Sequence, residues 1–421
     1  MMSTVTGRDL PGLADAPDKR STTALSDYLA KVRGGEVGAL PAVLGLIVLA
    51  LVFTGLRSDT FPTTFNFANL INQGAGVIVI AMGLVFVLLL GEIDLSAGFT
   101  AGTAGAVLGV AVTNHGMPWW IGVIVCLASG ALIGLVIGLL VARLGIPSFV
   151  VTLALFLALQ GVLLQIIGEG GQISISNPTL LAVMNSNLAL WQGWVLYVLV
   201  VVGFGAVSYR RMAKRRAKGL HAERFSVWGF KFGTLVVLLG IVTFLLSRER
   251  SVNVEATSIM GVPMVVPVLI LLLVGLTILL NRTAFGRHVY AVGGNAEAAR
   301  RAGINVANIR LICFIICSTM AAVAGILIGS RDNGVTPNTG GNQTLLYAVG
   351  AAVIGGTSLF GGKGRPVDAI VGGLVVAIIA NGMALLNQPA GVVYVVTGLV
   401  LLVAASVDAL SRRRAAATGR F

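Results

Sequence analysis

Long apolar runs separated by short polar segments extend over most of this sequence, and they constrain its fold more than any other feature. The chain has 421 residues, of which 56% are hydrophobic and only 11% are charged. Soluble globular domains carry about 25% charged residues, whereas an α-helix that crosses a bilayer needs about 20 predominantly apolar residues. The pattern excludes an ordinary soluble domain and predicts an all-α polytopic membrane protein.

Twelve apolar segments have lengths that suit membrane helices, which places both termini on the same side. The short segment 343–356 and the pair within 69–113 also fit broken or re-entrant elements that do not cross completely. We therefore expect ten to twelve transmembrane helices. The segments are 40–56, 69–90, 96–113, 119–142, 148–167, 191–209, 226–246, 264–281, 309–329, 343–356, 366–387 and 391–408.

The distribution of Lys and Arg indicates the orientation, because cytoplasmic segments of membrane proteins carry an excess of basic residues. With the N-terminus inside, 24 of the 29 Lys and Arg residues fall in predicted cytoplasmic segments and four fall in predicted outer loops. Both termini are therefore predicted to be cytoplasmic. The expected parts are a disordered tail (1–39), a transmembrane domain (40–408) with a cytoplasmic loop at 282–308, and a basic tail (409–421).

Glycine is unusually frequent, with 55 residues against an average usage of about 7%. Small residues let membrane helices approach one another closely. Close helix packing is predicted along two stripes with four-residue spacing, at Gly130, Gly134 and Gly138 and at Gly325 and Gly329.

The formal charge of +13 would suggest a nucleic-acid partner in a soluble protein. Here the basic residues stand between apolar runs, so we interpret them as topology signals and expect membrane lipid, not nucleic acid, as their partner. The cysteines and histidines are scattered and indicate no disulfide framework, metal site or catalytic site. They are Cys126, Cys313, Cys317, His115, His221 and His288.

One polar segment, GEIDLSAG at 91–98, interrupts an apolar stretch with two acidic residues. An ionised carboxylate at the bilayer centre costs about 2.5–3.5 kcal/mol or more, so we expect Glu92 and Asp94 at an interface or in a wet cavity. In one interpretation Asp94 or Ser96 caps a helix start and Gly98 permits close packing. In the other, the segment belongs to a translocation path at a helix break. Both interpretations can hold together.

A second polar segment, at 286–305, is basic, rich in glycine and flanked by long apolar runs. It predicts a short amphipathic helix with a side-chain cap, an acid in the first turn, basic residues in the last turn and a terminating glycine. With no apolar partner recognisable in the chain, we expect this helix to dock a soluble partner, the alternative being a solvated connector. The residues are Asn295, Glu297, Arg300, Arg301 and Gly303.

A third segment, at 355–364, resembles a phosphate-binding loop only superficially. Such a loop needs a glycine where Thr357 stands and a hydroxyl residue where Gly364 follows Lys363. No other segment provides a nucleotide site. We therefore expect no cofactor and no enzymatic activity in this chain, and we expect a partner subunit to bind and hydrolyse any ATP that drives it.

Taken in order, three segments resemble the permease subunits of bacterial ATP-binding-cassette importers of ribose, xylose and related monosaccharides. They are GEIDLSAG at 91–98, GRHVYAVGGNAEAARRAGIN at 286–305 and IGGTSLFGGKG at 354–364. With the intervening spans the resemblance covers about 40–408. The length, and the additional hydrophobic pair around 210–224, are most similar to the longer, xylose-type permeases.

Two departures from the family pattern bear on the substrate. Glu92 stands where glycine is usual, and 344–349 reads TLLYAV where many relatives have an acidic stretch. Substrate preference is therefore not transferred from this region, and the expectation of a pentose rests on the layout of the chain.

The resemblance implies a homodimer in the bacterial inner membrane, with a cytoplasmic ATP-binding subunit and an extracytoplasmic sugar-binding protein as partners. It further implies that 295–303 contacts the ATPase and that 94–99 lies near the translocation path. Neutral polar side chains near helix breaks suit a sugar path, because they form hydrogen bonds without charge. The expected path residues are Asp94, Ser96, Phe99, Thr152, Gln160 and Asn381.

These features predict the permease subunit of an ATP-driven importer of a monosaccharide, with xylose or another pentose as cargo. The main alternative is an ion-coupled secondary transporter of small solutes. Such transporters place ionisable residues inside the membrane, and the candidates here are Glu92, Asp94, Asp368 and Asp408. A third possibility keeps the ATP-driven machine and changes the cargo to another hexose, pentose or nucleoside.

Overall fold

The computed structural model describes residues 40–220, 225–251, 254–255 and 258–417, and most of them are helical. The tail expected at 1–39 lies outside the described residues. The last helix does not end at the expected domain boundary near 408 but continues to Ala417.

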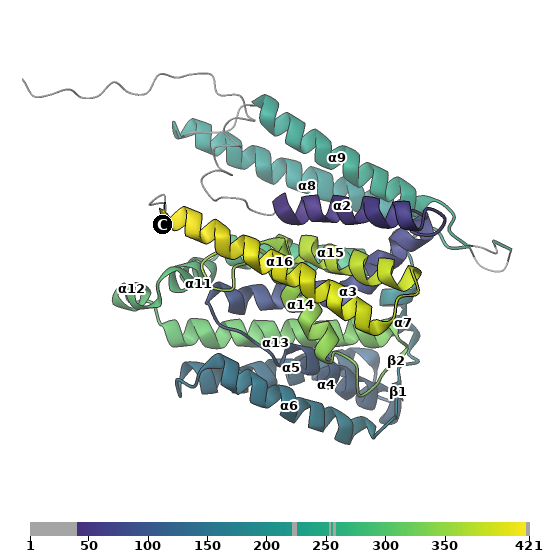
Figure 1. Ribbon diagram of the computed structural model, residues 1–421, viewed down its shortest axis with the longest axis horizontal. Coiled ribbons are helices and arrows are strands. Elements are labelled where there is room, and N and C mark those ends of the chain that lie inside the picture. Colours follow the sequence, from purple (N-terminus) through teal and green to yellow (C-terminus); the bar gives the residue numbers. More distant parts are fainter. Residues whose placement is uncertain (1–39, 221–224, 252–253, 256–257, 418–421) are drawn as a thin grey trace, which may run out of the picture. The chain divides into compact units, whose positions relative to one another are not determined.

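The described elements follow one another with short connections (Figure 1). They are α2 (Leu40–Leu56), α3 (Thr64–Leu89), α4 (Ala97–Gly109), the π-helical turn η1 (Val110–Asn114), α5 (Trp119–Ala142), α6 (Ser148–Ile167), β1 (Ile173–Ser174), α7 (Pro178–Asn185), α8 (Leu190–Ala217), α9 (Phe225–Ser247), α10 (Val265–Arg282), α11 (Ala284–Gly294), α12 (Ala296–Arg301), α13 (Val306–Arg331), β2 (Gly334–Val335), α14 (Asn342–Gly355), α15 (Pro366–Leu385) and α16 (Ala390–Ala417).

Each of the twelve predicted segments is helical, and the all-α polytopic fold is confirmed. Among the described residues, eight helices are long and apolar enough to cross a membrane. At 14 residues, α14 is only about 21 Å long, shorter than a hydrocarbon layer of about 30 Å. With 13 residues, α4 extends further only through η1. These are two of the elements predicted to be incomplete or re-entrant, and the number of full crossings stays a prediction.

Helix boundaries follow local signals in the sequence. At the start of α3, the Thr63 hydroxyl accepts a hydrogen bond from the Asn66 backbone N–H at 3.2 Å, which satisfies one free donor of the first turn. Pro366 is the first residue of α15, a position where its missing N–H costs nothing. Gly356 ends α14 with a left-handed φ of 115°, a conformation that favours glycine.

Loops assigned to the outer side meet at one end of the helices. Strand β1 pairs antiparallel with β2, with Ile173 opposite Val335. In the neighbouring loops, Asn187 forms an antiparallel bridge with Pro263. These contacts join the connections after α6, α7, α9 and α13, all of which the charge distribution placed on one side.

Segments assigned to the cytoplasmic side meet at the opposite ends of the same helices. Arg143, after α5, donates a hydrogen bond of 2.7 Å to the Asn308 side chain at the start of α13. Arg310 pairs with Glu92, after α3, at 3.1 Å. The structure thus groups the connections as the predicted topology requires, while the cytoplasmic identity of this end stays a prediction.

Helices α3 and α13 form the buried centre of the fold. Nearly every α3 side chain from Ala75 to Leu89 is buried, and the two helices pack against each other, with α5 on the other side of α13. Close packing along both predicted glycine stripes is confirmed. A Cβ atom at Gly134 would lie 2.6 Å from the Phe314 carbonyl oxygen of α13, and one at Gly325 would overlap the backbone of Ala101 in α4.

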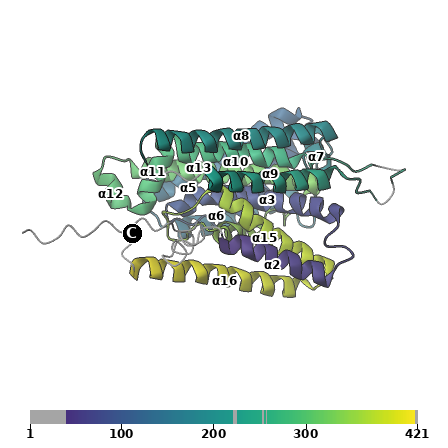
Figure 2. The same cartoon turned by 90° about the horizontal axis from the view of Figure 1, so that it is seen from above.

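Helices α8 and α9, the additional hydrophobic pair, lie side by side in both views (Figures 1 and 2). Their contact is aromatic, because Trp228 of α9 meets Tyr209 of α8 edge-on at 5.7 Å. Trp228 also stacks on Phe232 of its own helix at 5.2 Å. Few of their side chains are buried. Because lipid solvates exposed apolar side chains, such a pair needs no further protein cover in a membrane.

One carboxylate organises the connection after α9, which is predicted to lie on the outer side. Glu249 accepts hydrogen bonds from the backbone N–H groups of Arg250, Ser251 and Ile259 and from the Ser258 hydroxyl, at 2.5–2.9 Å. These donors favour the ionised form. They lower the pKa of Glu249 to about 2.

Candidate functional site

The break between α3 and α4 is stabilised by a buried carboxylate. Asp94 is fully buried, and its Oδ1 accepts hydrogen bonds from the Ser96 backbone N–H at 2.9 Å and from the Ser96 hydroxyl at 2.6 Å. Among the described residues, its Oδ2 has no hydrogen-bond partner of ordinary geometry. Both bonds come from Ser96, the N-cap residue of α4, which itself makes no side-chain cap hydrogen bond. Asp94 therefore holds the turn before α4 and does not form the expected cap of the first helical turn.

Two residues of α6 form hydrogen bonds with the break between α3 and α4. The Thr152 hydroxyl donates to the Ser148 carbonyl at 2.9 Å and lies 3.3 Å from the Ile93 carbonyl, and the Ile93 N–H donates to the Ser148 hydroxyl. One turn further along α4, Phe99 packs edge-on against Phe156 of α6 at 4.8 Å. Four of the six expected path residues thus gather where α4 meets α6.

The other two expected path residues lie elsewhere. Asn381 on α15 forms a reciprocal pair of 2.9 Å hydrogen bonds with Asn66 of α3, and it donates to the Gln73 side chain at 3.3 Å. Gln160 is half-buried on α6. None of the six lines the cavity described next or a smaller one between α14 and α16, so their role in the path stays a prediction.

A cavity of about 520 Å³ lies between α3, α13, α14 and α15, within the range of about 300–1,000 Å³ typical of small-molecule sites. Its apolar lining comes mostly from Gly, Ala and Val. Amide and hydroxyl groups and one guanidinium provide its polar lining, so that hydrogen bonds and not charges dominate its chemistry. The polar residues are Asn69, Gln73, Arg331, Gln343, Thr344 and Tyr347.

This cavity was not predicted from the sequence, although the sequence contains a signal for it. Asn69 and Gln73 stand four residues apart within an apolar run, as do Gln343 and Tyr347, so each pair shares a helix face. Polar side chains within membrane segments are costly and mark functional surfaces. Thr344 and Tyr347 also fall in the stretch that departs from the family pattern.

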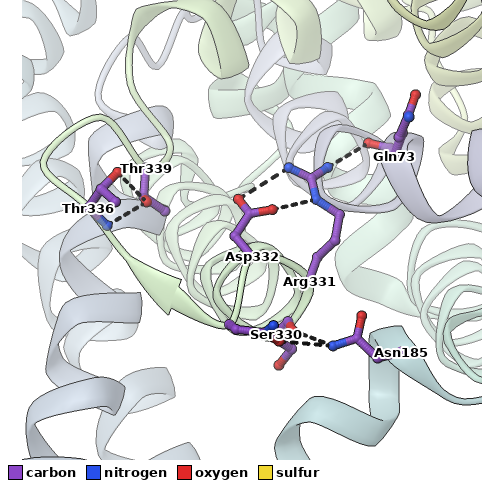
Figure 3. A network of polar contacts seen from close by, with 8 residues as sticks. Gln73, Asn185, Ser330, Arg331, Asp332, Thr336 and Thr339 are labelled. Atoms are coloured by element: carbon purple, nitrogen blue, oxygen red, sulfur yellow. Dashed lines mark hydrogen bonds and ion pairs between the residues drawn. The ribbon is translucent and has the colours of Figure 1, made fainter. Parts of the chain in front are cut away.

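A polar network surrounds the rim of the cavity at the end of α13 (Figure 3). Arg331 forms an ion pair with Asp332 at 2.8 Å, and its Nη1 lies 3.4 Å from the Gln73 carbonyl oxygen. Asn185 of α7 donates to the Ser330 carbonyl at 3.0 Å. These bonds tie the outer loops to the helices that line the cavity.

At the opposite end, the end of α3 meets the motif segments 286–305 and 354–364 in what we call the joint, formed by Leu89, Tyr290, Gly293, Gly362 and Gly364. The Gly362 N–H donates to the Leu89 carbonyl at 2.9 Å, and the Tyr290 hydroxyl donates to the Gly364 carbonyl at 2.8 Å. A Cβ atom on Gly293 would overlap the Leu89 carbonyl oxygen. Backbone therefore touches backbone with no space for a side chain.

The glycine-rich loop at 355–364 uses its backbone within the protein. Its Ser358 N–H donates to the Lys363 carbonyl at 2.9 Å, and its Gly362 N–H donates to Leu89. A phosphate cradle needs several such N–H groups pointing to a common open space. The loop is a structural part of the joint.

Directly beyond the joint lies α12, the predicted docking helix. The Asn295 side chain caps it by accepting from the Ala298 N–H at 2.9 Å, and Gly303 follows it with a φ of 85°. Exposed Arg300 and Arg301 pair with Glu297 at 2.7 and 3.3 Å. The predicted cap, dipole-matched charges and terminator are all confirmed.

The prediction for the packing of α12 was wrong. The helix was expected to have no apolar partner in its own chain, yet Ala299 is buried in the main hydrophobic core. A six-residue helix has one narrow face available for packing, and the small Ala side chain places that face against the core. The charged face opposite Ala299 is the part that remains available to a partner.

Comparisons with known proteins agree on the class of protein. A family model described as the permease component of the branched-chain amino acid transport system matches residues 66–405. The chain is 36% identical over 373 residues to the xylose transport system permease protein XylH of Escherichia coli (strain K12), covering 88% of this chain and 92% of that protein. No solved structure matches the chain.

Two further relatives are also permeases. The fructose import permease protein FrcC of Rhizobium meliloti is 28% identical over 406 residues, covering 96% of this chain and 92% of that protein. The ribose import permease protein RbsC of Escherichia coli (strain K12) is 29% identical over 371 residues, covering 87% and 92%. With a family match across most of its length and the apolar helices to span the bacterial cell membrane, the chain belongs to this family of transport-system permease components.

Proposed function

We propose that the chain is the translocation subunit of an ATP-driven importer of a monosaccharide, with xylose or another pentose as its cargo. Identity to the xylose permease exceeds identity to the fructose and ribose permeases mentioned above. The cavity supports this cargo because it offers amide and hydroxyl groups, which hydrogen-bond to sugar hydroxyls without requiring charge.

The observation that carries the proposal is the course of α3. At its end, the Leu89 carbonyl belongs to the joint, and near its start Asn69 and Gln73 line the cavity. The intervening turns are buried almost completely. Because a packed helix moves as one body, a displacement at the joint reaches the cavity wall without an intermediate element.

The proposed cycle begins at α12, where a cytoplasmic ATP-binding subunit seats against the exposed face with Arg300 and Arg301. Closure of two such subunits moves α12 and the joint, and thereby α3. The break at Asp94 and Ser96, directly beyond α3, then forms the inner part of the path. A sugar-binding protein delivers cargo at the outer end, and a second copy of the permease completes the assembly.

Three of the four acids that were candidates for ion coupling have bonding partners that do not favour such a role, and the side chain of the fourth, Asp408, lies outside the described part of the chain. Asp94 is engaged with Ser96, Glu92 pairs with Arg310 at 3.1 Å, and Asp368 pairs with Arg365 at 2.8 Å. A proton or sodium relay needs carboxylates that can exchange partners during transport. The hydrogen bonds of Asp94 and the ion pairs of Glu92 and Asp368 are sufficient to explain why these acids lie where they do.

Reconstitution in proteoliposomes tests the function. The permease, an ATP-binding subunit and a sugar-binding protein, taken together, are expected to take up labelled xylose only with ATP supplied on the cytoplasmic face. Omission of the ATP-binding subunit is the matched control. Uptake that persists without nucleotide, or that stops when a proton gradient is dissipated while ATP is maintained, would contradict the proposal.

A further inference from the structure

The cavity contains one charged group among its described lining residues, the guanidinium of Arg331. Its Nη1 lies 3.4 Å from the Gln73 carbonyl oxygen, which holds the side chain against the cavity wall. A guanidinium in such a position would by itself favour anionic ligands, because its planar fork binds carboxylates through two parallel hydrogen bonds. The group that hydrogen-bonds to this guanidinium therefore decides which solutes the cavity accepts.

In this structure the fork is occupied by the neighbouring residue. Arg331 Nε donates to Asp332 Oδ1 at 2.8 Å, and Nη2 donates to Oδ2 at 3.3 Å (Figure 3). Asp332 directly follows α13 and the cavity-lining Arg331, and its side chain is 45% exposed. The two opposite charges cancel, so the cavity presents no net charge to a solute.

We propose that Asp332 is a specificity-determining residue that makes the cavity select neutral sugars and reject sugar acids. This inference rests on the proposed function, since it concerns the cargo of the same cavity. A free carboxylate must displace one that is tethered beside Arg331 and acts at a high effective concentration. It must also approach the negative charge of Asp332, which repels it.

Two solutes of nearly the same shape separate this effect from size. Glucuronate in its ring form is xylopyranose with a carboxylate added at carbon 5, so it offers the same ring hydroxyls and one negative charge. Equilibrium binding of radiolabelled xylose and glucuronate is measured on the permease in complex with its ATP-binding subunit, in lipid nanodiscs. The wild-type complex is expected to bind xylose and to reject glucuronate.

The variant Asp332→Asn keeps the side-chain shape and removes the negative charge. We expect glucuronate binding to strengthen by about tenfold or more, as a bidentate charge-assisted pair with Arg331 becomes available. Xylose binding is expected to change by less than about threefold, because neutral hydrogen bonds contribute modestly. Added salt should weaken the new glucuronate binding and leave xylose binding unchanged.

Two control variants assign the effect to Arg331. Asp59→Asn breaks an ion pair of similar type, with Arg57 at 3.2 Å, that lies outside the cavity lining, and should leave glucuronate rejected. The double variant Arg331→Gln with Asp332→Asn should lose the gain in glucuronate binding. Retention of that gain in the double variant would overturn the assignment.

The outcomes distinguish this inference from the proposed function. If wild type binds xylose and binds glucuronate equally well, or if Asp332→Asn binds xylose and still rejects glucuronate, then Asp332 does not set charge selectivity. The comparison of xylose and glucuronate binding in the wild-type complex does not depend on the folding of any variant. If the wild-type complex neither binds nor transports any neutral monosaccharide, the proposed function itself fails.

Discussion

The joint and the cavity lie at opposite ends of α3, and they are built on different principles. At the joint, glycines bring three backbone segments into direct contact, with Gly293 against Leu89 and the Gly362 N–H bonded to the Leu89 carbonyl. Around the cavity, side chains from four helices surround about 520 Å³ of space. This difference suits the proposed function, in which one end transmits movement and the other accommodates a solute.

The physical difference lies in how each end responds to change. Backbone contacts without side chains cannot rearrange by rotamer changes, so an added methyl group must displace a whole segment. Polar side chains around a space can rotate or bind water when one of them is shortened. We therefore expect abrupt effects of substitution at the joint and graded effects in the cavity.

The largest effect is expected for Gly293→Ala. The added Cβ would overlap the Leu89 carbonyl oxygen, and overpacking of this kind costs about 1–3 kcal/mol or more. ATP-driven xylose uptake should fall by about tenfold or more, with lower thermal stability in detergent. Gly294→Ala is the matched control, because no atom lies within 4 Å of a Cβ there. Equal loss in both variants would refute the special role of the joint.

A second strong effect is expected for Arg300→Glu on α12. The Arg300 side chain is 63% exposed, so the unfolding free energy should change by about 0.5 kcal/mol or less. Uptake and co-purification with the ATP-binding subunit should nevertheless be lost. Arg211→Glu, exposed on α8, controls for charge on another predicted cytoplasmic segment. Normal co-purification of the Arg300 variant would argue against α12 as the contact.

A graded effect is expected for Tyr347→Phe in the cavity. The change removes a hydroxyl that accepts from the Gln343 side chain at 2.7 Å, and one such hydrogen bond is worth about 1 kcal/mol. The KM for xylose uptake should rise by about fivefold, with the maximal rate retained. Tyr394→Phe is the control, because Tyr394 lines a smaller cavity of about 290 Å³ and not the one of about 520 Å³. This variant should leave KM unchanged. Complete loss of xylose uptake in Tyr347→Phe would contradict the expected difference between the cavity and the joint.

The smallest effect is local and depends on pH. Because the pKa of Glu249 is lowered to about 2 from an ordinary value of about 4.3, its stabilisation of the outer loop is present above about pH 4.3 and is lost as pH falls toward about 2. A fluorophore on Met260→Cys should show rising mobility across this range. In Glu249→Gln the label should already be mobile at pH 7, and a pH response that survives in this variant would assign the effect elsewhere.

Much of the inner end was predictable because its signals are local. Asn295, Glu297, Arg300 and Gly303 lie within nine residues, and capping and dipole effects act over one turn. The buried face of the same helix was not predictable, because Ala299 contacts a core built from distant segments.

The outer cavity shows the opposite case. Gln73, Arg331 and Tyr347 come from three helices far apart in the sequence, and their convergence depends on how α3, α13, α14 and α15 cross. The expected path residues were chosen by their nearness to helix breaks, a local criterion. In the structure, Asp94 and Ser96 hydrogen-bond to each other in the break before α4. Thr152 of α6 contacts that break, Phe99 packs α4 against α6, and Asn381 pairs α15 with α3.

The sequence by itself determined the class of fold, the segments that form helices, the grouping of their connections at two ends and the form of α12. Apolar content, charge distribution and capping residues act through the solvent or within a few turns, so each can be read without a structure. Tertiary structure alone decided which glycines meet at the joint and which polar groups line the cavity. Those features depend on distances between helices, which close packing of many side chains settles together.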